Sequence, residues 1–325
     1  MLLALETEFQ SLLPTAKPPT FLEVGISQAY KPWASRLDVM LATPQAIANQ
    51  MEAMIWDAGH HCIIEELAQV PYIEIVNKLE NHQFVASTLT IPHRVGTAYL
   101  AKHKECQIEG KSFKDFIKQS AQERGLYETI FAIDPFSIIF GCFLSHIQGV
   151  LRIPRMLSAE FVAENAIAMP NGGASHDPID ASGKGVVVQS YFEGAKKGTK
   201  RSALGLGNVP YLRESYTAQS YKGYFVLDSR PLRRSTLPEE SKRFLEVMGE
   251  YLIAKFLSEP VQLRSECFLA PVDSIAKFGE LRDLAAIKAE LQSLITANQP
   301  HWRSRTTFAL SLKFDEVKEE EQAAD

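Results

Sequence analysis

The segment YTAQSYKGYFVL, residues 216–227, is the strand pattern from which the fold of this chain can be read. It is rich in aromatic and β-branched residues, as half-buried strands are. Downstream, Pro238 precedes a helix expected over 239–258, then a strand at 265–270, a helix near 278–297 and a last strand at 308–314. Upstream, residues 186–192 are also strand-like. This order predicts an α+β fold with a small antiparallel sheet and two helices, as in ferredoxin-like folds.

The N-terminal half is richer in helix signals. Thr43 can cap a helix in which Pro44 takes the first position, and a second helix is expected from Ser112 to Arg124, ended by Gly125. A third, buried helix is expected from Asp134 to His146 because this stretch is apolar nearly all round. Residues 151–155 and 157–168 look extended or mixed, and residues 169–185 and 193–208 are Gly-rich and predict long loops.

Composition places the chain among globular proteins. It has 325 residues, of which 46% are hydrophobic and 22% are charged, and its net charge is −5. The charge is unevenly distributed, since residues 184–234 carry ten basic and three acidic side chains while the last eleven residues carry six acids and one lysine. A local basic segment of this kind can bind a polyanion because charges act over about a Debye length.

Signals for catalysis, metals and export are weak. His60 and His61 are adjacent, so on a helix their side chains would point about 100° apart and would not share a tetrahedral metal easily. We expect no cofactor and no metal site. The N-terminus is not a signal peptide and no apolar stretch has the length of a membrane span, which predicts a cytoplasmic protein. The four widely spaced cysteines are expected to be buried or idle thiols.

Basic Gly-rich loops lie next to strand candidates that contain aromatic residues. The aromatics are Tyr191, Phe192, Tyr221, Tyr224 and Phe225. Cations that hold phosphates beside rings that stack on bases suit a single-stranded nucleic acid. The same rings could instead pack a core, and composition leaves both interpretations open.

Four blocks of sequence, in order between residues 40 and 270, resemble one protein family. The longest runs from Asp134 to Gly141 and continues from Leu151 to Ala159; the others lie at 48–52, 92–94 and 207–228. Together they resemble the CRISPR-associated RAMP-superfamily backbone subunit, of Cas-seven type, of the type I-G (formerly I-U) Cascade complex. Gly172, Gly173, Asp177 and Asp180 fall where that family has a glycine–aspartate loop. Gln50 stands where the family tends to carry a basic residue.

The resemblance implies a fold and a function. It implies a modified RRM-like palm with helical finger and thumb insertions over residues 43–314, after an extended N-terminal segment (1–42) and before a disordered acidic tail (315–325). Copies would stack head to tail along a CRISPR RNA and present it to target DNA, together with a large subunit and a Cas-five/Cas-six type fusion subunit. Such a subunit reads the guide's backbone rather than its sequence. No membrane is involved and no catalysis is expected. The expected RNA contacts are Asn49, Gln50, His93, Arg94, Arg152, Arg155, Lys184, Lys196, Lys197, Lys200, Arg201, Asn208 and Arg213.

Two alternatives remain open from the sequence. An RNA-cleaving backbone subunit would use a loop aspartate, for which Asp177 and Asp180 are the candidates, although such carboxylates often only form turns. A pure protein-interaction scaffold would use its basic loops to bind acidic neighbours.

Overall fold

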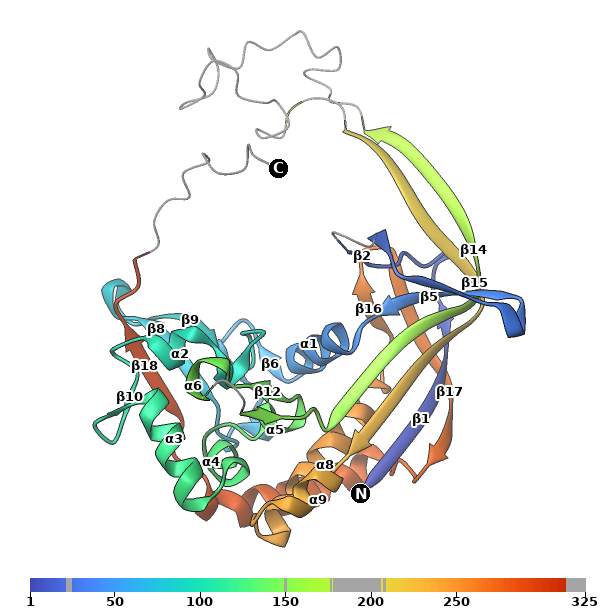
Figure 1. Cartoon of the computed structure of the whole chain (residues 1–325). Helices are drawn as coiled ribbons and strands as arrows, with labels where there is room; N and C mark the ends of the chain where they lie inside the picture. Colours follow the sequence, from blue (N-terminus) through green and yellow to red (C-terminus); the bar gives the residue numbers. More distant parts are fainter. Residues whose placement is uncertain (22–24, 149–150, 176, 178–205, 207–208, 314–325) are drawn as a thin grey trace, which may run out of the picture.

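The computed structural model describes all residues except 22–24, 149–150, 176, 178–205, 207–208 and 314–325. Within the described part, the chain has a mixed α+β architecture built around one curled antiparallel sheet (Figure 1). Its seven strands lie in the order β16 (Val261–Arg264), β17 (Cys267–Phe278), β1 (Leu2–Ser11), β15 (Val209–Asp228), β14 (Leu157–Ser175), β5 (Arg36–Ala42) and β4 (Gln28–Lys31).

Strand β1 lies inside this sheet, between β15 and β17. Its Leu5 is in register with Phe225 of β15 and with Ala276 of β17. Leu3, Leu5, Thr7 and Phe9 alternate with more exposed residues, so one face of the strand is buried, as the period of two requires. We expected the sheet to form from the C-terminal half alone. That expectation is wrong, because a strand at the very start of the chain completes it.

Two helices cover the buried face of the sheet. These are α1 (Pro44–Met54), which packs on β14, and α8 (Glu239–Phe256), which packs on β15. Phe256 of α8 lies with its ring centroid 5.9 Å from those of both Phe161 and Phe225. Helix α9 (Leu284–Asn298) packs against α8 on the side away from the sheet, where Arg243 contacts Glu290 at 2.7 Å (Figure 1).

The capping signals read from the sequence are confirmed for two helices. Thr43 accepts a hydrogen bond from the Ala46 N–H at the start of α1. Ser112 does the same for Asp115 at the start of α3 (Phe113–Arg124), and Gly125 is its C-cap. The helix expected near 278–297 begins later than predicted, because β17 continues to Phe278 and Asp283 caps α9.

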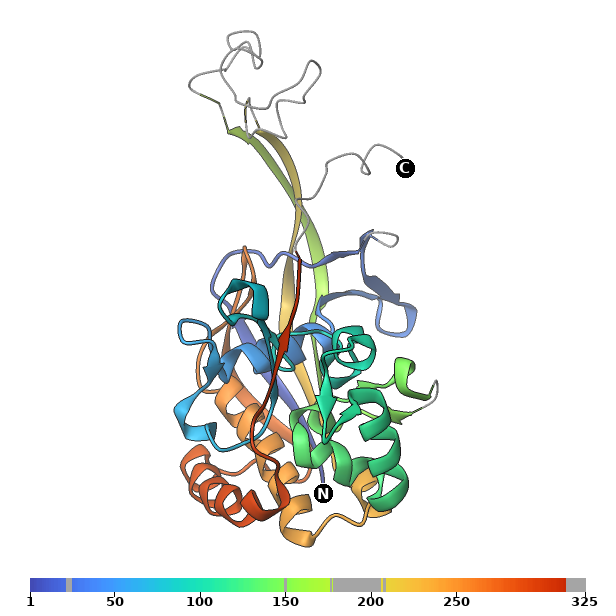
Figure 2. The same cartoon turned by 90° about the vertical axis from the view of Figure 1, so that its left-hand side faces the viewer.

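Strands β14 and β15 form a long hairpin that leaves the sheet. Pairing of β14 with β5 ends at Ala163 and that of β15 with β1 at Tyr221, whereas β14 and β15 pair with each other as far as Ser175 and Val209. The free half of the hairpin projects away from the body of the molecule (Figures 1 and 2). The loop expected over 169–185 is therefore wrong as far as Ser175, since this part is strand.

Residues 56–148 and 151–155 form a second region beside the sheet, made of short elements (Figure 1). Its helices are α2 (Ala98–Lys102), α3, α4 (Leu126–Ile133), α5 (Phe136–Ile139) and α6 (Ser145–Gln148), with 3-10 turns η2 (Glu65–Leu67), η3 (Lys78–Glu80) and η4 (Arg94–Gly96). Its two-residue strands pair as β6 (Trp56–Asp57) with β7 (Cys62–Ile63), β10 (Gln107–Ile108) with β11 (Lys111–Ser112), and β12 (Cys142–Phe143) with β13 (Arg152–Ile153). Elsewhere lie β2 (Thr20–Phe21) paired with β3 (Gly25–Ile26), and 3-10 turns η1 (Pro32–Ala34), η6 (Arg230–Arg234) and η7 (Gln299–His301).

The last strand, β18 (Thr306–Leu310), belongs to this second region and not to the main sheet. It pairs in parallel with β8 (Ile73–Asn77), which pairs antiparallel with β9 (Gln83–Ser87). The end of the chain therefore ties the second region to the sheet and its helices. The expected place of this strand in a ferredoxin-like sheet is wrong, because its alternating pattern does not say which sheet it joins.

The single helix expected from Asp134 to His146 is also wrong, although its burial is confirmed. Gly141 has a φ of 77°, in the left-handed region, and interrupts the segment between α5 and β12. A Cβ at Gly141 would lie 2.9 Å from the backbone N of Arg155, so the glycine also lets the Ile153–Arg155 segment approach. An apolar run without periodicity does not distinguish one helix from several short buried elements.

The four cysteines are free thiols, and Cys106, Cys142 and Cys267 are buried. None of the described helices combines the length and hydropathy that crossing a membrane requires. Residues 186–192, for which a strand was expected, lie outside the described residues.

Candidate nucleic-acid interface

Four of the expected RNA-binding residues line one groove of the second region. The groove has a volume of about 570 Å³ and lies between η4, β12 and β13 on one side and the start of α1 on the other. We call it the arginine groove, and its polar side chains are Gln45, His93, Arg94, Arg152 and Arg155. Residues 60 positions apart in sequence meet here because β13 pairs with β12, which in turn lies against η4.

Arg152 and Arg155 present their guanidinium groups to this groove. Arg152 is exposed, and its guanidinium carbon lies 4.6 Å from the ring centroid of Phe143. Arg155 is half-buried, where its Nε donates to the Phe140 carbonyl at 3.1 Å and an Nη donates to the Gln45 side chain at 2.9 Å. Within the described part of the chain, neither arginine has a carboxylate within ion-pair distance. Both charges are therefore held in place and remain available to an anion.

Burial also acts on the charge of Arg155. Burial, assisted by the charge of Arg94, lowers the pKa of this guanidinium, while the charge of Glu52 acts in the opposite direction. A guanidinium still stays protonated at neutral pH. An anion that entered the groove would offset the unpaired charge of Arg155, which favours binding of a phosphate.

Arg94 is held in a buried ion pair. It is only 3% exposed, and its guanidinium binds Glu52 of α1 through two bonds, Nε–Oε1 at 2.6 Å and Nη2–Oε2 at 2.9 Å. It also lies 5.2 Å from the Phe140 ring centroid and donates to the Gly141 carbonyl at 3.4 Å. Arg94 therefore joins α1 to the wall of the groove, and a direct phosphate contact from it stays a prediction.

The backbone at Arg94 is held in an uncommon conformation. Its φ is 48°, in the left-handed region that costs a bulky residue of the order of 1–2 kcal/mol. The buried ion pair with Glu52 offsets this cost and fixes η4. Burial raises the pKa of Glu52 to about 7, against the opposing effect of Arg94.

A second buried carboxyl supports the same wall. Asp134 accepts a 2.8 Å hydrogen bond from the Ser137 hydroxyl, and burial raises its pKa to about 6. The Val95 N–H approaches the Ser137 oxygen at 3.5 Å, so α5 and η4 are connected through this group. The wall of the groove is thus a rigid, internally bonded structure.

The two amides expected on α1 are separated by the helix. Asn49 faces an adjoining cavity of about 230 Å³, which shares Pro92 with the arginine groove. Gln50 lines a different pocket of about 360 Å³, beside Lys255 and Phe256 of α8. Adjacent helical residues point about 100° apart, so only Asn49 lies near the groove.

The remaining expected contacts belong to the hairpin and to the segment that joins its strands. Arg213 lies on β15 and is in register with Asn171 of β14. Asp177, a candidate for cleavage, is half-buried just beyond β14. The expected contacts that lie outside the described residues are Lys184, Lys196, Lys197, Lys200, Arg201 and Asn208, together with Asp180.

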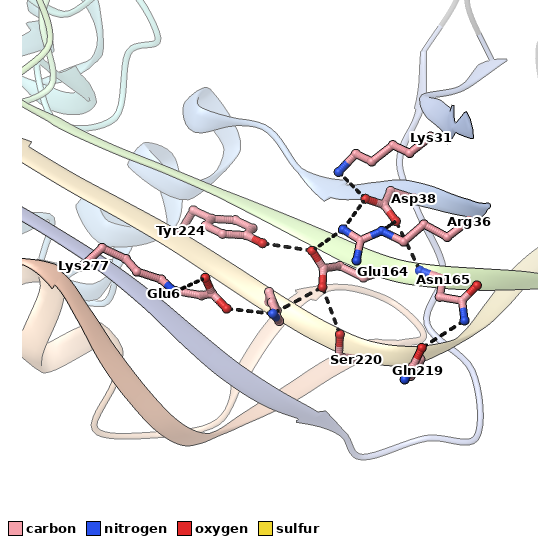
Figure 3. A network of polar contacts seen from close by, with 11 residues as sticks. Glu6, Lys31, Arg36, Asp38, Glu164, Asn165, Gln219, Ser220, Tyr224 and Lys277 are labelled. Carbon is pink, nitrogen blue, oxygen red and sulfur yellow. Dashed lines mark hydrogen bonds and ion pairs between the residues drawn. The ribbon is translucent and has the colours of Figure 1, made fainter. Parts of the chain in front are cut away.

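The outer face of the main sheet carries many charges, which pair with one another (Figure 3). Glu164 accepts from Arg36 at 2.8 Å, from the Tyr224 hydroxyl at 3.0 Å and from Ser220 at 3.2 Å, and Lys222 lies 3.3 Å away. We call this group the sheet-face network, and its other members are Glu6, Lys31, Asp38, Asn165, Gln219 and Lys277.

The carboxylates of this network are stabilised in their charged form. Burial opposes ionisation of Glu164, but the Tyr224 hydroxyl and the charges of Lys222 and Arg36 outweigh it, and its pKa is lowered. The pKa of Glu6 is lowered by its hydrogen bonds from Lys222 and Lys277. Positive charges that are already paired in this way attract an incoming phosphate only weakly.

Tyr221, Tyr224 and Phe225 of β15 do not form an open stacking platform. Phe225 and Tyr221 are buried in the core, and Tyr224 donates its hydroxyl to Glu164. For Tyr221 and Phe225 the core-packing interpretation is therefore confirmed. Tyr191 and Phe192 lie outside the described residues.

Sequence reasoning missed three residues that complete the groove. Gln45 orients Arg155, Glu52 neutralises Arg94, and the 44% exposed ring of Phe143 supports Arg152. The blocks at 48–52 and 92–94 both resemble the family, and each contains one charged residue that could pair with the other, Glu52 and Arg94.

Part of the chain matches a known protein family. Residues 14–168 match the sequence profile of the family described as CRISPR-associated protein GSU0053. The chain is thus similar, over a stretch that contains the arginine groove and its buried ion pair, to a CRISPR-associated family. Among curated proteins, none matches the sequence.

Two solved structures are similar to the chain at low identity. A chain of a "CRISPR RNA-guided surveillance complex, pre-nicking" has 12% identity and a TM-score of 0.42, and the alignment covers 88% of this chain and 79% of that one. Csc2 from Thermofilum pendens has 11% identity and a TM-score of 0.30, with 92% and 74% covered.

Proposed function

We propose that this protein is a non-catalytic, CRISPR RNA-binding backbone subunit of Cas-seven type in a type I-G Cascade complex. Copies would stack along the guide RNA in the cytoplasm and present it to target DNA, with the large subunit and the Cas-five/Cas-six type subunit as partners. The observation that carries the proposal is the arginine groove. It lies within the stretch that is similar to a CRISPR-associated family, and it holds Arg152 and Arg155 without carboxylate partners in the described chain.

The strand order of the sheet supports an RRM-like palm. Strand β1, helix α1 and strand β14 form one β–α–β unit, and β15 lies between its two strands. Strand β15, helix α8 and strand β17 form a second such unit, in which β1 lies between the strands. Two interleaved units of this kind are the split β–α–β arrangement of ferredoxin-like folds. Residues 56–155 and the projecting hairpin are the insertions of that palm.

The test is the salt dependence of RNA binding by the full chain with single-stranded guide RNA. The double variant Arg152→Ala/Arg155→Ala should bind RNA at least tenfold more weakly at about 0.1 M salt. Its slope of log K against log salt should be smaller by about 0.7 for each phosphate contact that is lost.

A matched control is Arg230→Ala, which removes an exposed arginine that pairs with Asp228 at 2.7 Å. It should leave the slope unchanged. An unchanged slope in the double variant, with RNA still bound, would remove both arginines from the interface. Cleavage of bound RNA that is lost in Asp177→Ala or Asp180→Ala would contradict the non-catalytic part of the proposal.

A further inference from the structure

A second pocket opens beside the arginine groove and shares two residues with it. It has a volume of about 750 Å³, and His93 and Phe143 line both spaces. The remaining wall comes from η4, α2 and α6, with Tyr99, Lys102, His103 and His146. We call it the aromatic pocket. Its size is within the range of pockets that hold small molecules.

The aromatic pocket has an unusual lining for a protein surface. Phe143 is 44% exposed and Tyr99 is 54% exposed, so two rings face solvent instead of packing in the core. Among the described residues, no Glu or Asp side chain lines the pocket. Its ionisable side chains are one lysine, Lys102, and three histidines: His93, His103 and His146. Lys102 has no ion-pair partner within the described residues, and His103 lies 3.9 Å from Glu105 outside the lining.

The ring of Phe143 is fixed in position. The Arg152 guanidinium lies over it at 4.6 Å, and β12 is held against η4 because Gly96 has no side chain. A Cβ at Gly96 would overlap the Phe143 carbonyl. A pre-positioned ring loses little conformational freedom when another flat group stacks on it.

We propose that the aromatic pocket binds one unpaired nucleotide of the strand that lies in the arginine groove. The base stacks on Phe143 or Tyr99, and its phosphate lies near Lys102. This occupant matches both features of the lining, since it combines a planar apolar ring with an anion. The pocket and the groove share His93 and Phe143 as lining residues, so a strand in the groove lies next to the pocket and can place one base in it. The inference deepens the proposed function, because it names a base-binding subsite next to the phosphate-binding groove.

A mononucleotide tests the pocket without depending on the rest of the RNA. Saturation-transfer NMR of adenosine 5′-monophosphate with the full-length protein should show transfer to the base protons. Phe143→Leu should lose at least three-quarters of this transfer, and Lys102→Ala should weaken it about threefold. Phe143→Tyr keeps an aromatic ring and should retain the transfer to the base protons. This variant therefore tests whether the ring itself, and not the identity of residue 143, is required.

Tyr30→Leu is the matched control, because Tyr30 is an aromatic residue on β4 with 62% exposure and lies outside the pocket. It should leave the transfer unchanged. Absence of base transfer in the wild type, or equal transfer in the wild type and Phe143→Leu, would overturn the inference. Failure of the proposed function would be seen in a different experiment. It would appear as an unchanged salt slope of RNA binding in Arg152→Ala/Arg155→Ala, whereas the mononucleotide NMR experiment tests only the aromatic pocket.

Discussion

The arginine groove and the sheet-face network both contain cationic and aromatic side chains and differ in how their positive charges are satisfied. In the network, Lys222 contacts both Glu6 and Glu164, and Arg36 contacts Glu164 at 2.8 Å. In the groove, Arg155 is held by neutral acceptors and Arg152 by an aromatic ring. A count of basic and aromatic residues does not separate the two regions. The pairing of the charges favours the groove as the RNA site.

The largest effect on stability is expected at the buried Arg94–Glu52 pair. Arg94→Ala should lower the free energy of unfolding by about 3–5 kcal/mol, because it leaves the Glu52 carboxylate buried without a partner. Denaturant unfolding of the full chain measures this. Arg152→Ala, which removes an exposed guanidinium from the same groove, should change stability by less than about 0.5 kcal/mol.

Replacement of both partners by apolar residues provides the control for that prediction. Arg94→Met combined with Glu52→Leu should recover most of the lost stability, since no buried charge remains. Equal effects of Arg94→Ala and Arg152→Ala would contradict the structural role that the burial of Arg94 implies.

The pH dependence of the two regions should have opposite signs. The pKa of Glu52 is raised to about 7, so the stability of the wild type relative to Glu52→Gln should fall as pH rises from about 4.5 to 7, by at most about 3 kcal/mol. The pKa of Glu164 is lowered, so its contribution is present above the ordinary value of 4.5. It is lost as pH falls below that value, and Glu164→Gln should then approach the wild type.

Thermal unfolding of the wild type and the two variants between pH 3 and 8 measures both effects. If the stability contributions of Glu52 and Glu164 changed with pH in the same direction, the proposed difference between the groove wall and the sheet face would be wrong.

The smallest expected effect is on RNA binding by the sheet-face network. Lys222→Ala removes a cation from a cluster that is already neutralised by Glu6 and Glu164, so the affinity for guide RNA should change less than twofold. Filter binding at fixed salt measures this. A loss as large as that of Arg152→Ala/Arg155→Ala would move the interface to the sheet.

Local signals explain what could be predicted from the sequence. Thr43 and Ser112 act as caps through their own hydroxyls, and the alternation of buried Tyr221, Phe225 and Leu227 along β15 is visible in its sequence. The resemblance also led to the groove, since His93, Arg94, Arg152 and Arg155 lie together in it.

Long-range pairing explains what could not be predicted. Nothing in the sequence of residues 2–11 shows that they pair with 221–228, and nothing in residues 306–310 shows that they join β8 in parallel. Arg94 and Glu52 are 42 positions apart, so the burial that separates Arg94 from Arg152 appears only in three dimensions. The same holds for Tyr221 and Phe225, which composition could not assign to core or surface.

The most direct test of the account is to map where RNA touches the protein. Guide RNA that contains 4-thiouridine would be cross-linked to the full-length protein by light, and the attached peptides identified by mass spectrometry. If RNA lies in the arginine groove and the aromatic pocket, cross-links are expected in peptides that contain residues 92–103 and 140–155. Cross-links to the outer sheet face around Tyr224, with none in those two segments, would contradict it.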